Sequence, residues 1–411
     1  MVFPDLGVPR ECVLAMSHSH TPEQCLAVLL CSTHERRSKR EDDAVALVER
    51  AHDNRLLALL ERLKVAPLVG QRLLALPTVI APSVANRIES LTADARRRGT
   101  ALELLTLAVL HELEDAGIRS LPLKGSTLSR ALYGDTAMRT SADVDVLVAP
   151  EDLSHAAEVV RRMGWRQADG TFSNGTLPLL HERFVHPKLP SVEVHWRVHY
   201  YETRFAAEAL ARAERPRAGE PLRMQPADEL ASLILFYARD GFSGLRTPAD
   251  VATWWSSVPA HLSADPSLEM IAYRHSALAA PIELGMALLA SLVGAPAPGP
   301  HRLPARLRLA ARIANPFLIG GHTQISSNAA LVDVVLSPSS GRRAAMRRHL
   351  VLNRPSAPYE HFAALGPVGA GLAKVEHALR VFRRWGLGLV SATVGVYKRG
   401  EAPPALRRLS R

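Results

Sequence analysis

The segment LPLKGSTLSRALYGDTAMRTSADVDVLV, residues 121–148, ends in a short apolar run, Asp143–Val148, that carries two aspartates near its start. Such a run is typical of a buried β-strand. Because alternate side chains of a strand share a face, we expect Asp143 and Asp145 to point the same way and to lie close together. Two neighbouring carboxylates beside an apolar core are costly unless a cation holds them. The pair therefore predicts a metal site on this strand, with two solvated carboxylates at a strand end as the alternative.

A third carboxylate in a similar setting is Glu193, in the strand-like sequence VEVHW at residues 192–196. Alternation places Glu193 and His195 on one side of that strand and the apolar residues on the other. If this strand lies beside the Asp143 strand, three carboxylates converge. Carboxylates arranged in this way suit phosphoryl or nucleotidyl transfer, where they hold Mg²⁺ ions about 3.5–4 Å apart.

The tripeptide Lys124-Gly125-Ser126 stands where a predicted strand, Ile118–Leu123, becomes a predicted helix, Ser126–Leu132. Glycine lets backbone N–H groups approach a phosphate, and a helix N-terminus adds partial positive charge. The tripeptide is not a P-loop, because that motif is GxxxxGK[ST] and here the lysine precedes the glycine. On its own the tripeptide is weak evidence for a phosphate contact, and capping of the sheet edge by Lys124 is the alternative.

The same residues resemble a known superfamily. Gly125-Ser126, followed after a short helix by Asp143-x-Asp145 on a strand, resembles nucleotidyltransferases with a polymerase-β-like palm. More closely, residues 121–148 together with the later EVHW resemble the uncharacterised nucleotidyltransferase family, in which LKG-x-x-L, LY, DxDxLV and E-x-HW recur. The resemblance is strong over about 121–200, looser over 43–120 and 226–256, and faint beyond 300.

The resemblance implies two groups of site residues. The metal-binding and catalytic group is Asp143, Asp145 and Glu193, and the nucleotide-binding group is Lys124, Gly125, Ser126 and Arg139. The implied cofactor is Mg²⁺ or Mn²⁺, and the implied substrate is a nucleoside triphosphate such as ATP.

Three observations leave alternatives open. Arg139 could instead pair with Asp143 or Asp135 and support the loop of the same site. Many family members have a histidine where this chain has FYAR, residues 236–239, so any role of that histidine is in doubt here. A zinc site is a further alternative, although the spacing of the nearby histidines matches no standard site. Those histidines are His181, His186, His195 and His199.

Helical periodicity dominates from about Asp43 to Ala116 and returns from Pro226 onward. Between these regions, shorter alternating segments predict a β-α-β-α-β order. The remaining predicted strands are Asp143–Val148, Arg183–His186 and Val192–Val198, and the predicted helices include Pro82–Leu91, Thr92–Ala116, Glu151–Met163 and Ser267–Val293. The fold class predicted is α+β and mostly helical, with a small mixed sheet as the nucleotidyltransferase palm flanked by helical regions.

The domain boundaries follow from these changes of pattern. Residues 1–40 have no sustained period and are expected to form a mobile tail or a poorly fixed helix. The other predicted parts are a helical region at 41–116, the palm at 117–220, a helical domain at 221–340 and a basic C-terminal segment at 341–411.

The net charge of +10 is distributed unevenly along the 411 residues. From Gly341 to the end there are fourteen Lys or Arg and three Glu, a net +11, which leaves about −1 for residues 1–340. The predicted last helix, Leu372–Leu387, is basic and amphipathic. A solvated face is the simplest interpretation, and an anionic partner such as RNA or a membrane surface is the alternative.

Composition narrows the class of protein. Aromatic residues make up only 5 % while Ala, Leu and Arg dominate, which favours helices over an all-β fold. The three cysteines, at 12, 25 and 31, form no CxxC pair, so we expect no disulfide framework. The longest apolar stretch, Leu284–Val293, is shorter than the roughly 20 residues that span a bilayer. We expect a cytoplasmic protein without a transmembrane segment or secretory signal.

These observations favour a Mg²⁺-dependent nucleotidyltransferase that moves a nucleoside monophosphate from an NTP to a hydroxyl or amine of an unknown acceptor. The acceptor could be a small molecule, a protein or RNA. One alternative is a catalytically inactive nucleotide-binding or scaffolding protein with the same fold. Another is an RNA-directed enzyme that uses the basic C-terminal segment.

Overall fold

The computed structural model describes most of the chain. The described residues are 20–168, 180–257, 267–296, 303–314, 316–317 and 322–338, with a few helical positions between 343 and 383. The chain forms two compact units, one comprising Met1–Tyr237 and Gly244–His301 and the other Ala238–Ser243 and Arg302–Arg411. The sheet and every predicted site residue belong to the first unit.

The N-terminal region begins with a well-formed helix, α2 (Pro22–Cys31), where a tail was predicted. Thr21 caps it: the Thr21 hydroxyl accepts from the Gln24 backbone N–H, and the Gln24 side chain accepts from the Thr21 N–H. Its apolar residues from Leu26 to Cys31 are buried, and Leu26 is completely so. Of the two expectations for residues 1–40, a mobile tail or a poorly fixed helix, the mobile tail is wrong for residues 21–31, where the continuous apolar run showed no helical period and yet forms a buried helix. The helices that follow are α3 (His34–Lys39), α4 (Glu41–Arg50), α5 (Asp53–Arg62) and α6 (Ala66–Leu74).

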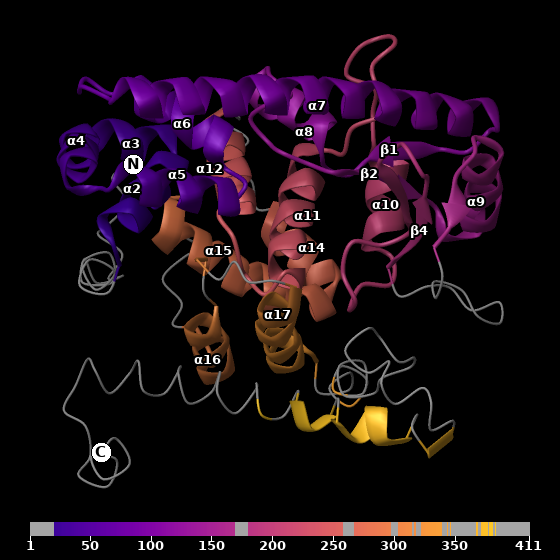
Figure 1. The fold of residues 1–411 in the computed structure, drawn as a ribbon. Helices are drawn as coiled ribbons and strands as arrows, with labels where there is room; N and C mark the ends of the chain where they lie inside the picture. Colours follow the sequence, from indigo (N-terminus) through magenta and orange to yellow (C-terminus); the bar gives the residue numbers. More distant parts are fainter. Residues whose placement is uncertain are drawn as a thin grey trace, which may run out of the picture. The chain divides into compact units, whose positions relative to one another are not determined.

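One long helix, α7 (Pro82–Asp115), replaces the two helices predicted over this stretch. Figure 1 shows it passing from the N-terminal helices to the sheet and on towards α9. Gly99, inside the helix, allows a close backbone approach, because a Cβ there would lie 2.4 Å from the Thr136 carbonyl oxygen. The helix thus joins the N-terminal region and the sheet into one unit.

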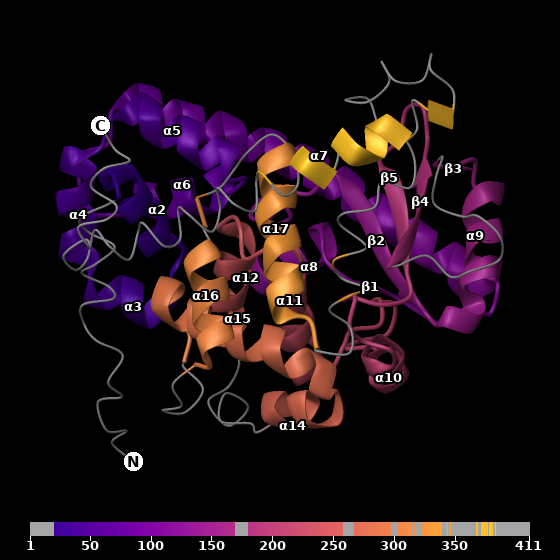
Figure 2. The same cartoon turned by 90° about the horizontal axis from the view of Figure 1, so that it is seen from below.

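The sheet contains five strands in the order β1-β2-β5-β4-β3. These are β1 (Ser120–Pro122), β2 (Asp143–Val148), β3 (Arg166–Gln167), β4 (His181–Val185) and β5 (Ser191–His195). Strand β5 runs parallel to β2, while the β1–β2, β3–β4 and β4–β5 pairs are antiparallel (Figure 2). In the parallel pair, Asp145 lies opposite Glu193. The sheet is therefore mixed, and its central pair carries the predicted carboxylates.

The two faces of β2 are packed differently. Its even-numbered residues, from Val144 to Val148, join an apolar cluster with α7, β5 and α9 (Leu153–Arg162). On the other face, Leu147 packs with residues of α10 (Phe205–Arg212) and α11 (Pro226–Arg239). Asp143 and Asp145 share this second face, near the start of the strand. The alternating sequence thus buries one face completely and leaves a polar corner on the other.

The remaining helices confirm the predicted α+β, mostly helical fold class with a small mixed sheet. They are α8 (Ser126–Tyr133), α12 (Arg246–Ser257), α14 (Ser267–Arg274), α15 (Ala279–Val293), α16 (Ala305–Ile313) and α17 (His322–Leu336). The single helix predicted over Ser267–Val293 is interrupted by a 3-10 turn at Ser276–Leu278.

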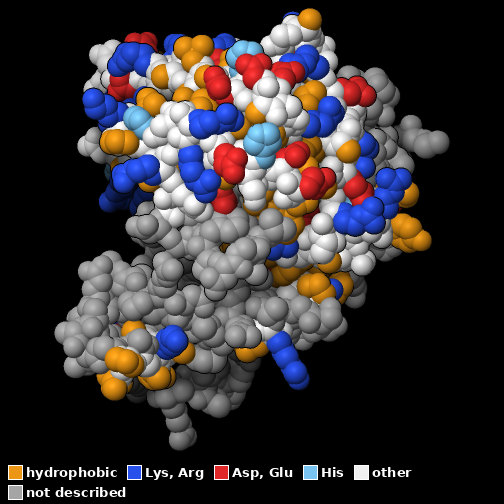
Figure 3. Space-filling view, turned by 90° about the vertical axis from the view of Figure 1, so that its right-hand side faces the viewer, with side chains coloured by type: hydrophobic (Ala, Val, Ile, Leu, Met, Phe, Trp, Pro, Cys, Tyr) orange, Lys and Arg blue, Asp and Glu red, His pale blue; other side chains and the backbone are white. Residues whose placement is uncertain are grey.

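The described part of the chain contains one helical stretch, Ser276–Val293, that is long and apolar enough to cross a membrane by length and composition alone. It is longer than the stretch counted from the sequence, and 56 % of it is buried inside the protein, as in a core helix. On the face in Figure 3, acidic and basic side chains of the first unit are interspersed. The predicted basic segment at 341–411 lies almost entirely outside the described residues.

Candidate active site

Three carboxylates from two neighbouring strands meet on the polar corner of the sheet. Asp143 and Asp145 come from β2 and Glu193 from β5, and one oxygen of each lies within 4.8 Å of the others. The parallel pairing of the strands and the two-residue alternation cause this convergence. The structure therefore brings together the three residues predicted as metal ligands, and their ligand role stays a prediction.

Asp145 is the most deeply buried of the three, at 1 % exposure. Its Oδ1 lies 3.2 Å from Lys124 Nζ and 3.0 Å from His195 Nε2. Burial alone would raise its pKa, but the Lys124 charge and the His195 hydrogen bond outweigh burial and hold the pKa of Asp145 well below its usual value. Its other oxygen, Oδ2, is buried and no donor among the described residues reaches it. Asp145 is thus an ionised group with one unused oxygen.

Asp143 stands at the rim of the cluster and is partly exposed. The Ser141 hydroxyl donates a hydrogen bond to its Oδ1 at 3.0 Å. Ser141 was not among the predicted site residues, and no local motif marks it. Its position two residues before Asp143 lets it orient that carboxylate.

Glu193 faces two histidines. His195 Nε2 lies 3.4 Å and His181 Nε2 lies 3.7 Å from Glu193 Oε2. Burial would raise the pKa of Glu193, but the hydrogen bond from His195 and the charge of His181 lower it below its usual value. Glu193 and His195 lie on one side of the strand, as predicted.

Lys124, Gly125 and Ser126 lead from β1 into α8, beside the carboxylates. Gly125 is the residue before the helix and has φ +89° and ψ −147°, a conformation essentially restricted to glycine. Lys124 Nζ also lies 5.4 Å from the centre of the Phe236 ring, on α11. Ser126 is buried, and its hydroxyl has no hydrogen-bond partner among the described residues. The structure thus places the lysine at the cluster and the glycine at the turn.

Arg139 is buried behind the site rather than exposed in it. Its Nε donates to Asp250 Oδ2 at 2.7 Å, and its backbone N–H donates to the Ser129 hydroxyl at 3.0 Å. Burial disfavours its charge, but Asp250 more than compensates and raises the pKa of Arg139. The partner is therefore Asp250, and the alternative pairing with Asp143 or Asp135 is wrong.

Asp250 completes this buried network from α12. Its Oδ1 accepts from the Tyr133 hydroxyl at 2.9 Å, and burial together with the Asp250 charge raises the pKa of Tyr133 well above its usual value. The network ties the end of α8, the loop before β2 and α12 together. Arg246, at the start of the same helix, adds a further tie to this loop, because its guanidinium donates to the Thr140 carbonyl at 2.8 Å.

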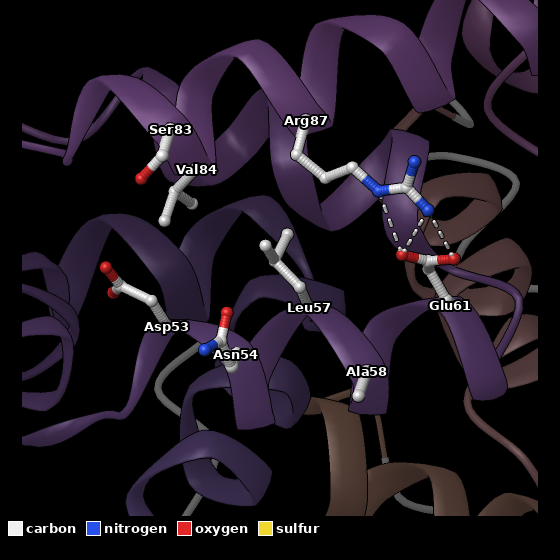
Figure 4. Close-up of a pocket in the computed structure, with 8 residues that line it drawn as sticks. All are labelled: Asp53, Asn54, Leu57, Ala58, Glu61, Ser83, Val84 and Arg87. Carbon is white, nitrogen blue, oxygen red and sulfur yellow. Dashed lines mark hydrogen bonds and ion pairs between the residues drawn. The ribbon is translucent and has the colours of Figure 1, made fainter.

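A separate hollow lies between α5 and α7, in the N-terminal helices (Figure 4). At one end Arg87 forms a double hydrogen bond with Glu61 at about 3.0 Å. The hollow is lined by Asp53, Asn54, Leu57, Ala58, Glu61, Ser83, Val84 and Arg87. None of the predicted site residues contributes to it, so it is not part of the carboxylate cluster.

The carboxylate cluster fits a hard divalent cation. All three donors are carboxylate oxygens, the ligands that Mg²⁺ and Mn²⁺ prefer. The buried Oδ2 of Asp145 has no other partner within the described residues, and an ion would satisfy it. Asp143, Asp145 and Glu193 are therefore the residues able to hold the metal.

Comparison with known proteins agrees with this geometry. The family model described as uncharacterised nucleotidyltransferase matches residues 49–292, which is more than half of the chain and includes every predicted site residue. No curated protein matches the chain.

Proposed function

Since the chain belongs to the uncharacterised nucleotidyltransferase family, we propose that it transfers a nucleoside monophosphate from an NTP to a hydroxyl or amine acceptor, with release of pyrophosphate. The reaction depends on Mg²⁺ or Mn²⁺ held by the three carboxylates. The chemistry belongs to the corner of the sheet formed by β2 and β5.

The observation that carries this proposal is the convergence of Asp143, Asp145 and Glu193 within 4.8 Å. A catalytically inactive protein with the same fold has no need to keep three carboxylates together on a half-buried face, where they repel one another. The unused oxygen of Asp145 points to the same conclusion, because a purely structural aspartate at 1 % exposure normally has partners on both oxygens.

Lys124 and Gly125 bind the triphosphate in this proposal. Lys124 Nζ lies at the edge of the carboxylate cluster, 3.2 Å from Asp145, where it can also contact a phosphate oxygen. Gly125 leaves the start of α8 free of a side chain, so that backbone N–H groups can approach a phosphate. Arg139 acts indirectly, since its buried pair with Asp250 fixes the loop that leads into β2.

Glu193 activates the acceptor in this proposal. A bound Mg²⁺ would neutralise the phosphates and stabilise the charge that develops at the α-phosphorus. Glu193 is ionised at neutral pH because its pKa is lowered, so its carboxylate can accept the proton of the acceptor hydroxyl. His195, 3.4 Å away, orients Glu193.

Labelled NTPs test the proposal. The full chain is incubated with each α-labelled NTP, Mg²⁺ and a cell extract that is separated afterwards into RNA, protein and small molecules. Pyrophosphate release with label in one fraction identifies the acceptor class. Label in RNA would support the RNA-directed form of the reaction.

Variants of the cluster decide whether the site is the one proposed. Asp143→Asn and Asp145→Asn are expected to lower pyrophosphate release by several orders of magnitude, whereas Glu151→Gln, an exposed carboxylate just after β2, should leave it unchanged. Unchanged release in the two aspartate variants would show that the site is elsewhere. NTP binding without any release would favour the inactive scaffold.

A further inference from the structure

We propose that His181, Glu193 and His195 form a second cation site, selective for a transition-metal dication of the Zn²⁺ class, which shares Glu193 with the carboxylate cluster. One ligand atom of each of the three residues lies within 4.8 Å of the others. The site takes a different kind of ion from the three-carboxylate cluster, because two of its three ligands are imidazoles.

The sheet builds this site across strands. His181 of β4 lies directly opposite His195 of β5 in the antiparallel pair, and their ring centres are 4.6 Å apart. Glu193 is two residues before His195 and therefore shares its face of the sheet. The histidine spacing along the sequence could not reveal this set, since the ligands meet through strand pairing.

The distances suit a small tetrahedral ion. Zn²⁺ with bonds of about 2.0–2.1 Å to nitrogen and oxygen places neighbouring ligand atoms about 3.3 Å apart. Glu193 Oε2 lies 3.4 Å from His195 Nε2 and 3.7 Å from His181 Nε2. Only small side-chain movements are needed to close the set around an ion.

The surroundings of His195 also favour a cation at this point. Its Nε2 faces two carboxylates at once, Asp145 at 3.0 Å and Glu193 at 3.4 Å. One N–H hydrogen can point well at only one of them, whereas a dication bound by Glu193 and the imidazole nitrogen takes its place, and the Lys124 ammonium remains 3.2 Å from Asp145. The His195 ring is fully buried, and the His181 side chain is 27 % exposed, so an ion can enter from the His181 side.

Sharing Glu193 links this site to the reaction, and this step rests on the function proposed above. When Glu193 binds a transition-metal ion together with the two histidines, its carboxylate is no longer available to Mg²⁺ or to the acceptor proton. Zn²⁺ is therefore expected to inhibit nucleotidyl transfer at concentrations where it fills this site.

Cobalt provides a direct test that does not depend on activity. Co²⁺ is titrated into the metal-free full chain in the presence of excess Mg²⁺, and its visible absorption is followed. One equivalent of Co²⁺ should produce the bands of an imidazole-bound ion, and Zn²⁺ should remove them. His181→Gln should weaken Co²⁺ binding at least about tenfold, while His155→Gln, an exposed histidine on α9, should leave it unchanged.

Replacing His181 by another metal ligand shows whether weaker Co²⁺ binding in His181→Gln comes from the lost ligand or from misfolding. His181→Cys should restore Co²⁺ binding and add a thiolate-to-cobalt band that the wild type lacks, because thiolate is an equally good ligand for this class of ion. Equal Co²⁺ affinity in the wild type and in His181→Gln overturns the proposal. So does a cysteine variant that binds Co²⁺ without the new band.

Inhibition distinguishes this proposal from the proposed function. If the chain transfers nucleotides, His181→Gln should need at least about tenfold more Zn²⁺ for the same inhibition, and equal sensitivity would overturn the link through Glu193. If no transfer is found in any extract fraction, the proposed function fails, and a Co²⁺ band that depends on His181 still supports the second site.

Discussion

Two buried aspartates, Asp145 and Asp250, are equally hidden from solvent but have different surroundings. Each is 1 % exposed. Asp250 has a partner on each oxygen: Arg139 Nε on Oδ2 at 2.7 Å and the Tyr133 hydroxyl on Oδ1 at 2.9 Å. Asp145 has both of its partners, Lys124 and His195, on Oδ1, and no donor within the described residues reaches its Oδ2.

The hydrogen-bond partners of the two carboxylates indicate that Asp250 has a structural role and that Asp145 is suited to bind a ligand. A buried charge with all its hydrogen bonds made holds segments together, and Asp250 joins α12 to the loop before β2 in this way. A buried carboxylate with one oxygen that accepts no hydrogen bond from the protein either binds a ligand through that oxygen or destabilises the folded state. The comparison predicts that the two aspartates fail in different ways when they are changed.

The largest effect is expected for Asp145→Asn. Loss of a metal-binding carboxylate should lower nucleotidyl transfer about 10³- to 10⁴-fold, which corresponds to about 4 to 5 kcal/mol of transition-state stabilisation. The variant should remain folded, since Lys124 is partly exposed and can turn to solvent. Pyrophosphate release and a urea unfolding curve measure the two effects separately. Transfer at the wild-type rate would mean that Asp145 is structural, like Asp250.

Asp250→Asn should show the opposite pattern. It leaves the Arg139 guanidinium buried without its counter-charge, which should lower the free energy of unfolding by about 3 to 4 kcal/mol. The urea midpoint should fall accordingly. The double variant Arg139→Met, Asp250→Leu should recover most of the loss, because it removes both charges and keeps the volume. A single variant as stable as the wild type would contradict the structural role.

Sequence reasoning could locate the carboxylate cluster because its signals are local. Alternation on a strand decides which side Asp143, Asp145 and Glu193 face, and the short apolar runs around them identify the strands. Only the pairing of β2 with β5 had to be assumed, and the structure confirms it. The α+β class followed from the same patterns.

The partners of these residues could not be predicted, since they come from distant segments. Asp250 is 111 positions after Arg139 in the chain, and no periodicity relates them. His181 was left out of its strand, because the charged sequence His181-Glu182-Arg183 has low strand propensity and the predicted strand began at Arg183. Tertiary pairing therefore decided both interactions.

A third buried carboxylate, Glu202, sharpens the comparison, since three backbone amides donate hydrogen bonds to it. It accepts from the N–H groups of Val198, His199 and Ala206, and burial, which outweighs these bonds, raises its pKa to about 7. The folded chain thus keeps this proton up to about pH 7, while the unfolded chain loses it near 4.5. Glu202 therefore contributes stability at low pH that is lost as the pH rises from about 4.5 to about 7.

Glu202→Gln should remove this dependence. Relative to the variant, the wild type should lose about 3 kcal/mol of unfolding free energy between pH 4.5 and pH 7. Urea unfolding of both proteins across this range measures the difference, and contributions from other groups cancel in it. The matched control is Glu158→Gln on the exposed side of α9, whose difference from the wild type should not change with pH. A constant difference for Glu202→Gln would mean that Glu202 is ionised throughout.

The smallest loss of stability is expected for alanine substitutions of the two glycines at the ends of α8. Gly125 precedes the helix with φ +89° and ψ −147°, and Gly134 ends it in the left-handed region with φ +72° and ψ −1°. Alanine at either position should cost about 1 to 2 kcal/mol of stability, because both backbones are unfavourable for a side chain. Only Gly125→Ala should also weaken NTP binding, since Gly125 lies beside Asp143 and Gly134 lies at the far end of the helix. Stability from urea unfolding and affinity from NTP titration separate the two effects. Equal NTP affinity in both variants would remove Gly125 from the phosphate cradle and leave Lys124 as its principal member.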